Sequence, residues 1–205
     1  MNVITIEEES VARAATKAIE AVRDHGVRIE RTVGNWCMMK PGKQTCLEVH
    51  NAVITITNPL KRWNSRVNSG VLVETLDYLL GLNPGFTHKS VWNFYQRFLE
   101  PDGKYPYTYG QRIFGDAGGI DQWKEVTGLM LKDHDTRHAH VTIYRSTDLF
   151  QEFVPCNFAW HFQPDEEDRV NMITFCRSQD ALRGLFLDCF AYTHFLEQLA
   201  LATGL

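Results

Sequence analysis

The sequence predicts an α+β fold, on three observations. Apolar residues recur at helical spacing in several segments, other segments are rich in β-branched residues, and the two kinds follow each other without the regular alternation of βαβ proteins. The 205 residues suit one domain of ordinary size. Because no internal repeat or shift in composition marks a boundary, we expect residues 1–205 to form a single domain.

The first third of the chain predicts one helix and one strand. Small apolar residues recur at helical spacing over residues 10–23, and Ser10 is a suitable N-cap, so a helix is expected there. Residues 27–42 are loop-like and carry charges. Residues 45–57 are rich in β-branched side chains and end at Asn58, before a proline, which predicts a strand.

The rest of the chain predicts helices and strands in mixed order. Helices are expected at residues 71–80, 90–98, 120–131 and 184–202, and strands at residues 140–144, 158–162 and 170–176. Between them, residues 101–119 are rich in glycine, proline and tyrosine. This segment is too long for a turn, so we expect a functional loop.

Charge and composition narrow the classes of function. The formal net charge of -4 argues against binding of long nucleic acid, but leaves room for a small phosphorylated ligand held by a few arginines. The acidic first nine residues are unlike a signal peptide, and no apolar run approaches a membrane span. Five cysteines without a CxxC pair predict neither a disulfide framework nor a metal site. The expected location is the reducing cytoplasm.

Cys156 is a candidate nucleophile. It follows Pro155 between two predicted strands, where the chain must turn. Cysteine thiolates are effective nucleophiles when a base or a cation activates them. The other interpretation is a buried structural thiol, which is the commoner fate of a cytosolic cysteine.

Three arginines and one glutamate are candidates for binding and proton transfer. Arg31, Arg137 and Arg177 each stand beside a hydroxyl-bearing residue, a combination suited to phosphate, although three solvated surface charges would look the same. Glu74 lies among apolar residues. It is either an exposed position of an amphipathic helix or a desolvated acid fit for proton relay.

Several motifs occur in a fixed order between residues 30 and 192. Arg177-Ser178-Gln179-Asp180 is followed by Gly184 and Tyr192, which resembles the RSxDxxLGLPFNxxxY signature of the thymidylate synthase family. Further matches to that family are Glu30-Arg31-Thr32, Glu74 with Gly81, Tyr109-Gly110-Gln111, Asp121-Gln122, Thr136-Arg137 with Asp148-Leu149, and Pro155-Cys156.

The resemblance implies a large mixed sheet packed by helices and paired in a homodimer. It also implies covalent chemistry in which Cys156 adds to C6 of a pyrimidine, Glu74 assists proton transfer and Tyr109 shapes the cavity around the base. The nucleotide-binding residues that it implies are Arg31, Arg137, Arg177, Ser178, Asp188, Tyr192 and Asn157. Arg137 is expected to reach across the dimer interface into a shared active site.

The implied cosubstrate is 5,10-methylenetetrahydrofolate, with Asp180 and Gly184 as its binding residues. Thiolate addition at C6 makes C5 nucleophilic enough to attack the one-carbon unit. A final hydride gives a methyl product, whereas water gives a hydroxymethyl product.

Departures from the family pattern bear on the substrate. Asn157 stands where the family has a histidine, His138 replaces an arginine, and His161 replaces a glutamine. Relative to the family, the sequence is truncated at the C-terminus, which leaves ribose and deoxyribose open. Asp188 stands where the family has an asparagine that matches uracil, and a carboxylate suits the amino group of cytosine better.

The leading hypothesis is therefore folate-dependent C5 hydroxymethylation of a cytidine nucleotide monophosphate, dCMP or CMP, which would make the protein a pyrimidine nucleotide hydroxymethyltransferase. Two alternatives stay open: a divergent thymidylate synthase that methylates dUMP, and a catalytically inactive nucleotide-binding homologue.

Overall fold

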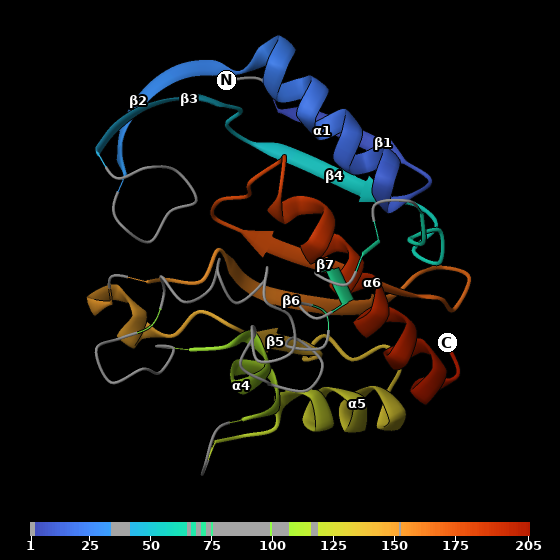
Figure 1. The fold of residues 1–205 in the computed structure, drawn as a ribbon. Coiled ribbons are helices and arrows are strands. Elements are labelled where there is room, and N and C mark those ends of the chain that lie inside the picture. The colour runs from blue at the N-terminus through green and yellow to red at the C-terminus, as the bar shows by residue number, and fades with distance from the viewer. Residues whose placement is uncertain are drawn as a thin grey trace.

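The computed structural model describes residues 3–33, 42–64, 67–68, 71–72, 75, 99, 107–115, 119–151 and 153–205. Its N-terminal part contains β1 (Ile4–Glu8), α1 (Val11–His25), β2 (Val27–Val33), β3 (Gly42–Glu48) and β4 (Ala52–Ile56). Figure 1 shows α1 lying against the β1–β4 pair at one end of the molecule.

Helix α1 confirms the first predicted helix. The Ser10 hydroxyl accepts a hydrogen bond from the Arg13 amide at 3.3 Å and so caps the helix. Val11, Ala14 and Ala18 are buried on one face. The apolar period therefore marks the face that packs into the protein.

The strands of this region differ from the prediction. Residues 27–33 form β2 rather than a loop, and residues 45–57 are divided between β3 and β4 by a turn in which Asn51 has a φ of 62°. Strand β1 was not predicted. No side chain that the structure describes in the β2–β3 hairpin is buried, so its residues need not alternate between apolar and polar, and residues 27–33 carry no strand period.

The second half contains α4 (Tyr109–Phe114), α5 (Gln122–Lys132), β5 (His140–Thr142), the 3₁₀ helix η2 (Ser146–Phe150), β6 (Asn157–Pro164), β7 (Val170–Cys176) and α6 (Gly184–Thr203). The predictions for α5, β5, β6, β7 and α6 are confirmed to within a few residues. Helix α4 lies inside the segment expected to be a loop. The helices predicted at 71–80 and 90–98 fall largely or wholly outside the described residues.

Strand pairing is both parallel and antiparallel, as expected for a mixed α+β protein. Within the described residues the strands form three separate units: β1 pairs with β4 in parallel, β2 with β3 in antiparallel, and β6 lies between β5 and β7 in an antiparallel sheet. The N-terminal strands form two separate sheets because consecutive strands β3 and β4 pair with different strands. Strand β3 pairs with the strand before it, whereas β4 pairs with the N-terminal strand.

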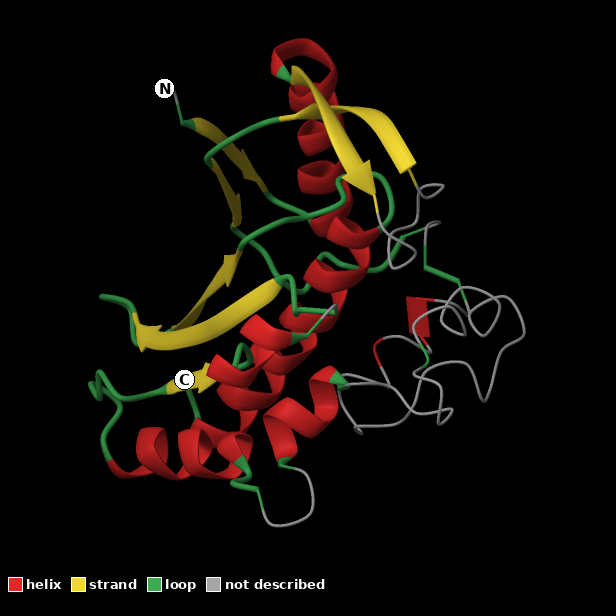
Figure 2. Cartoon of the chain, turned by 90° about the vertical axis from the view of Figure 1, so that its left-hand side faces the viewer, coloured by secondary structure: helices red, strands yellow, loops and turns green. Residues whose placement is uncertain are grey.

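Helix α6 joins the two halves of the core. Its first turns bury Leu185, Phe186 and Phe190 against β1, α1 and β4. Its later turns bury Phe195 and Leu199 with side chains of α4, α5 and the β5–β6–β7 sheet. Figures 1 and 2 show this helix running through the middle of the molecule, with α1 above it and α5 below. A helix covered on several sides has no polar face, which is why its sequence is apolar almost throughout. Even so, no helix in the described part of the chain is long and apolar enough to cross a membrane.

Candidate active site

Helix α4 places Tyr109 beside the cysteine loop. The Thr108 hydroxyl accepts from the Gln111 amide at 3.1 Å, and the Gln111 side-chain oxygen accepts from the Thr108 amide at the same distance. This reciprocal cap fixes the first turn, which Tyr109 begins. The Tyr109 hydroxyl forms a hydrogen bond with the backbone of Cys156. Burial raises the pKa of Tyr109 well above its ordinary value, and the nearby Tyr107 and Asp188 raise it further.

A buried ion pair anchors the other end of α4. Arg112 donates to Asp148 at 2.7 Å, and both side chains are almost completely buried. The second Asp148 oxygen accepts from the Arg145 amide at 2.8 Å. The Arg112 guanidinium also lies 5.2 Å from the ring centre of Tyr107. Asp148 therefore ties the helix that carries Tyr109 to the 3₁₀ turn that precedes the cysteine loop.

The loop that carries Cys156 is held by Arg177. The Arg177 guanidinium donates to the carbonyls of Pro155 at 3.0 Å and Val154 at 2.9 Å. The Arg177 amide donates to the Cys156 carbonyl at 2.8 Å. The end of β7 thus fixes the backbone on both sides of the candidate nucleophile, and Cys156 itself is only partly buried.

A bulge at the start of β6 turns Asn157 into the core. Asn157 pairs with Cys176, but the next pair is Ala159 with Phe175, so Phe158 is the extra residue. Trp160 and Asn157 consequently both face inward, and both are buried. The Asn157 amide donates to the Tyr192 hydroxyl of α6 at 2.9 Å. Its side-chain oxygen is buried and has no hydrogen-bond partner among the described residues.

Asp188 lies on α6 among these groups. Its Oδ2 accepts from the Gln179 side chain at 2.7 Å. Burial raises the pKa of the Cys176 thiol to about 12, with the Asp188 charge as the next cause and Cys156 as a smaller one, while a hydrogen bond with Tyr192 opposes the shift. Burial also raises the pKa of Tyr192, again with Asp188 as the next cause. The structure therefore brings Cys156, Tyr109, Asn157, Asp188 and Tyr192 into one cluster.

Asp180 and Gly184 lie where the chain enters α6. Oδ1 of Asp180 accepts from the amides of Leu182 at 2.9 Å and Arg183 at 3.1 Å, and its carbonyl accepts from the Gly184 amide at 3.0 Å. Asp180 thus caps the turn before the helix, while its side chain stays exposed. Ser178 is exposed at the same end of β7.

Two predicted site residues are not part of this cluster, and a third cannot be placed relative to it. Arg31 lies on β2, which contacts only β3 among the described elements. Its Nε and Nη2 donate to the Glu48 carboxylate at 2.8 and 2.7 Å. Arg137 is exposed and forms no hydrogen bond or ion pair with any described residue. Glu74 lies outside the described residues.

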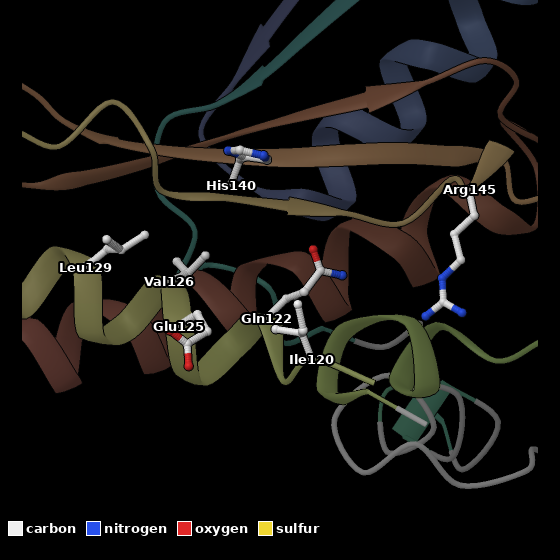
Figure 3. Close-up of a pocket in the computed structure, with 7 residues that line it drawn as sticks. All are labelled: Ile120, Gln122, Glu125, Val126, Leu129, His140 and Arg145. Atoms are coloured by element: carbon white, nitrogen blue, oxygen red, sulfur yellow. The ribbon is translucent and has the colours of Figure 1, made fainter. Parts of the chain in front are cut away.

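A shallow groove is present elsewhere, between α5 and β5. Figure 3 shows Gln122 extending from the start of α5 toward β5, and His140 and Arg145 on the strand side. The Gln122 amide donates to the Thr142 carbonyl at 2.9 Å and to the Arg112 carbonyl at 2.7 Å, and its oxygen accepts from the Thr142 amide at 2.8 Å. Gln122 thus binds the edge of β5 as a neighbouring strand would, so the resemblance at Asp121-Gln122 marks a structural contact.

Sequence reasoning missed three residues that support the cluster, Tyr107, Arg112 and Cys176, and it quoted Asp148 only as a motif match without a role. Arg112 follows Tyr109 by one helical turn, which would have been a signal had α4 been predicted. Cys176 immediately precedes the Arg177 motif, but a lone cysteine in a strand gives no indication of its neighbours.

The sequence and the fold are similar to those of known proteins. Residues 18–205 match the family model described as thymidylate synthase. A putative thymidylate synthase of Methanopyrus kandleri is 30% identical over 118 residues, which are 57% of this chain and 56% of that protein. The fold is similar to the crystal structure of thymidylate synthase from T4 phage, with a TM-score of 0.52 and 21% identity over 64% of this chain and 51% of that one. The chain thus matches about half the length of each relative.

Proposed function

Because this chain belongs to the thymidylate synthase family, whose members are one-carbon transferases, we propose that it transfers a one-carbon unit to C5 of a pyrimidine nucleoside monophosphate. Cys156 is the proposed covalent nucleophile. The observation that carries the proposal is a cluster of side chains from separate elements around the cysteine loop. Tyr109 of α4 and Cys176 of β7 lie near Cys156, and Asp188 and Tyr192 of α6 lie near Tyr109 and Cys176.

The chemistry requires a nucleophile that adds to C6. The Cys156 thiolate forms a bond to C6, and the electron pair of the C5–C6 double bond becomes available at C5. C5 then bonds to the one-carbon unit and loses its proton to a base. The bond between the one-carbon unit and the folate nitrogen would then break, which leaves a methylene group on C5. Addition of hydride or water to this methylene, with departure of the sulfur from C6, would restore the C5–C6 double bond and regenerate the thiolate. Tyr109 and Tyr192 are protonated at neutral pH, as tyrosines ordinarily are, and burial raises the pKa of each further, so both hydroxyls can donate hydrogen bonds.

The entry to α6 fits a folate. When bound, 5,10-methylenetetrahydrofolate would supply the one-carbon unit. Its pterin offers N–H donors, and Asp180 offers an exposed carboxylate whose Oδ2 has no hydrogen bond among the described residues. Because Oδ1 is fixed by backbone amides, the carboxylate is held in one orientation before any ligand binds. Gly184 keeps the surface beside it free of a side chain.

Phosphate binding is proposed for the arginines, with Ser178 beside them. The Arg177 side chain uses Nε and one terminal nitrogen to hold the Cys156 loop, which leaves its other terminal nitrogen available to an anion. Arg137 is exposed and free to bind a phosphate or to extend to a second subunit. Arg31 would first have to exchange Glu48 for the phosphate.

Asp188 supports a cytidylate as the substrate. It is partly buried, and its charge acts on the tyrosines and cysteines around Cys156. An ionised carboxylate accepts a hydrogen bond from the C4 amino group of cytosine but has no donor for O4 of uracil. The unpartnered Asn157 oxygen offers a second buried acceptor for a ligand N–H. Water as the final nucleophile would give a 5-hydroxymethyl product.

A homodimer with shared active sites is also proposed. Ile173 and Phe175 lie on the face of β7 turned away from α6, Phe158 is on the neighbouring strand, and each is at least 39% exposed. A second copy of this sheet would cover these side chains and bring the partner's arginine into reach of the nucleotide. The proposed location is the cytoplasm, where cysteines remain reduced.

The two alternatives predict different products and adducts. Methylation of dUMP would consume the reducing equivalents of the folate and release dihydrofolate, whereas hydroxymethylation would not. An inactive nucleotide-binding homologue would bind a 5-fluoropyrimidine nucleotide without forming a covalent adduct.

The test is release of tritium from C5 of labelled dCMP, CMP and dUMP, with and without methylenetetrahydrofolate. Wild type is expected to exchange the label, and Cys156→Ser is expected to lose exchange because an alcohol is a far weaker nucleophile than a thiolate. Cys46→Ser, on the β2–β3 hairpin, is the matched control and should retain exchange. Near-full exchange in Cys156→Ser would show that this thiol is structural.

A further inference from the structure

The glutamine immediately before Asp180 contacts the base-reading candidate Asp188. Gln179 is in the segment that enters α6, and its Nε2 donates to Asp188 Oδ2 at 2.7 Å. Both residues are partly buried. Since an ionised carboxylate only accepts hydrogen bonds, the amide group must present its NH₂ to Asp188.

We propose that Gln179 is the positioning residue for Asp188 and so sets which pyrimidine base the site prefers. The inference rests on the proposed base-reading role of Asp188. An aspartate on a helix has a χ1 torsion with few staggered wells and a broad χ2 torsion, and a hydrogen bond to one carboxylate oxygen restricts both. The hydrogen bond also favours the charged, acceptor-only form that suits cytosine and rejects uracil.

Gly184 provides the space that this contact needs. A Cβ at position 184 would lie 3.0 Å from Gln179 Nε2, 3.7 Å from the Asp180 Cβ and 4.0 Å from Asp188 Oδ2. The glycine backbone is not in the left-handed region, so space rather than conformation is the constraint here. A methyl group would push away the flexible end of Gln179, while the rest of the helix could stay in place.

This arrangement separates specificity from stability. Alanine is a better helix former than glycine, so Gly184→Ala should keep or raise Tm. If the Gln179–Asp188 contact sets base preference, the same substitution should lower that preference. If Gly184 had a purely structural role, Gly184→Ala would change Tm and the preference for dCMP in the same direction.

The experiment compares dissociation constants and kcat/KM for dCMP and dUMP in wild type, Gln179→Leu, Gly184→Ala and the double variant. Gln179→Leu keeps the approximate size and removes the donor. Each single variant should lose about tenfold of the dCMP preference, the order of one hydrogen bond to a charged group. The double variant should lose no more than the worse single variant, because both changes remove the same contact.

Two further variants complete the design. Gln179→Glu places a second carboxylate against Asp188 and should lower the preference further than Gln179→Leu. Arg183→Gln alters an exposed side chain in the same turn and should leave the ratio unchanged.

The outcomes distinguish this inference from the proposed function. A wild type that prefers dCMP, with variants of unchanged ratio, overturns the role of Gln179 alone. A wild type that does not distinguish the two nucleotides overturns the base-reading role of Asp188 and this inference with it. Absence of catalysis overturns the proposed reaction, and the dissociation constants still decide the positioning role.

Discussion

Replacing Asp148 by asparagine tests the ion pair that anchors α4. Asp148 is 1% exposed and Arg112 is 6% exposed. The carboxylate accepts from Arg112 through one oxygen and from the Arg145 amide through the other. Asparagine has one oxygen, so its NH₂ group must face one of these donors. The variant therefore loses a hydrogen bond and leaves the Arg112 cation buried without a counter-charge.

The magnitude follows from the burial of both partners. Removing one member of a buried ion pair costs about 3–5 kcal/mol. For a chain of this length each kcal/mol lowers Tm by about 2–4 °C, so the expected loss is about 6–20 °C. Urea unfolding followed by tryptophan fluorescence and a thermal scan would measure it. We expect the double variant Arg112→Met with Asp148→Leu to be more stable than Asp148→Asn, since it leaves no unpaired charge.

Two results would contradict this reasoning. A loss below about 1 kcal/mol for Asp148→Asn would mean that water or the Tyr107 ring already compensates the Arg112 charge. A double variant that loses the sum of the two single effects would mean that the residues stabilise the fold independently.

Three further predictions concern other parts of the molecule. Mixing the Arg137→Ala and Cys156→Ser variants should restore part of the activity if the arginine comes from a second subunit. If heterodimers form and no activity returns, a shared site is excluded. Asp180→Asn can still cap the turn before α6 and should spare nucleotide affinity while raising KM for the folate; an equal loss of nucleotide affinity would place Asp180 in the wrong subsite. His194 accepts from Arg62 at 3.2 Å and donates to the Phe190 carbonyl at 2.8 Å, and burial, followed by Arg62, lowers its pKa. The unfolded chain therefore binds the proton more readily, so the stability from neutral His194 is present above about pH 6.5 and is lost as the pH falls further. His194→Phe should flatten unfolding free energy against pH between about pH 7 and about pH 5, and an unchanged slope would assign that dependence to other groups.

The spacing of apolar residues along the chain predicts most of the helices and strands that contribute to the core. Helices α1, α5 and α6 and strands β5, β6 and β7 were predictable because each has an apolar face or lies within the core. Strand β2 and the short helix α4 were not. Exposed strands need no alternation, and a six-residue helix is stabilised by its cap and by a distant ion pair.

The candidate active site was likewise predictable from the sequence only in part. The sequence by itself determined the family resemblance and the candidates Cys156, Arg177, Asp180 and Asp188, because these lie in short motifs with fixed spacing. Only the tertiary structure decided that Gln179 binds Asp188 and that Arg112 is neutralised by Asp148. Such partners come from separate turns, helices and strands, and their pairing depends on how the chain packs, which local spacing does not encode.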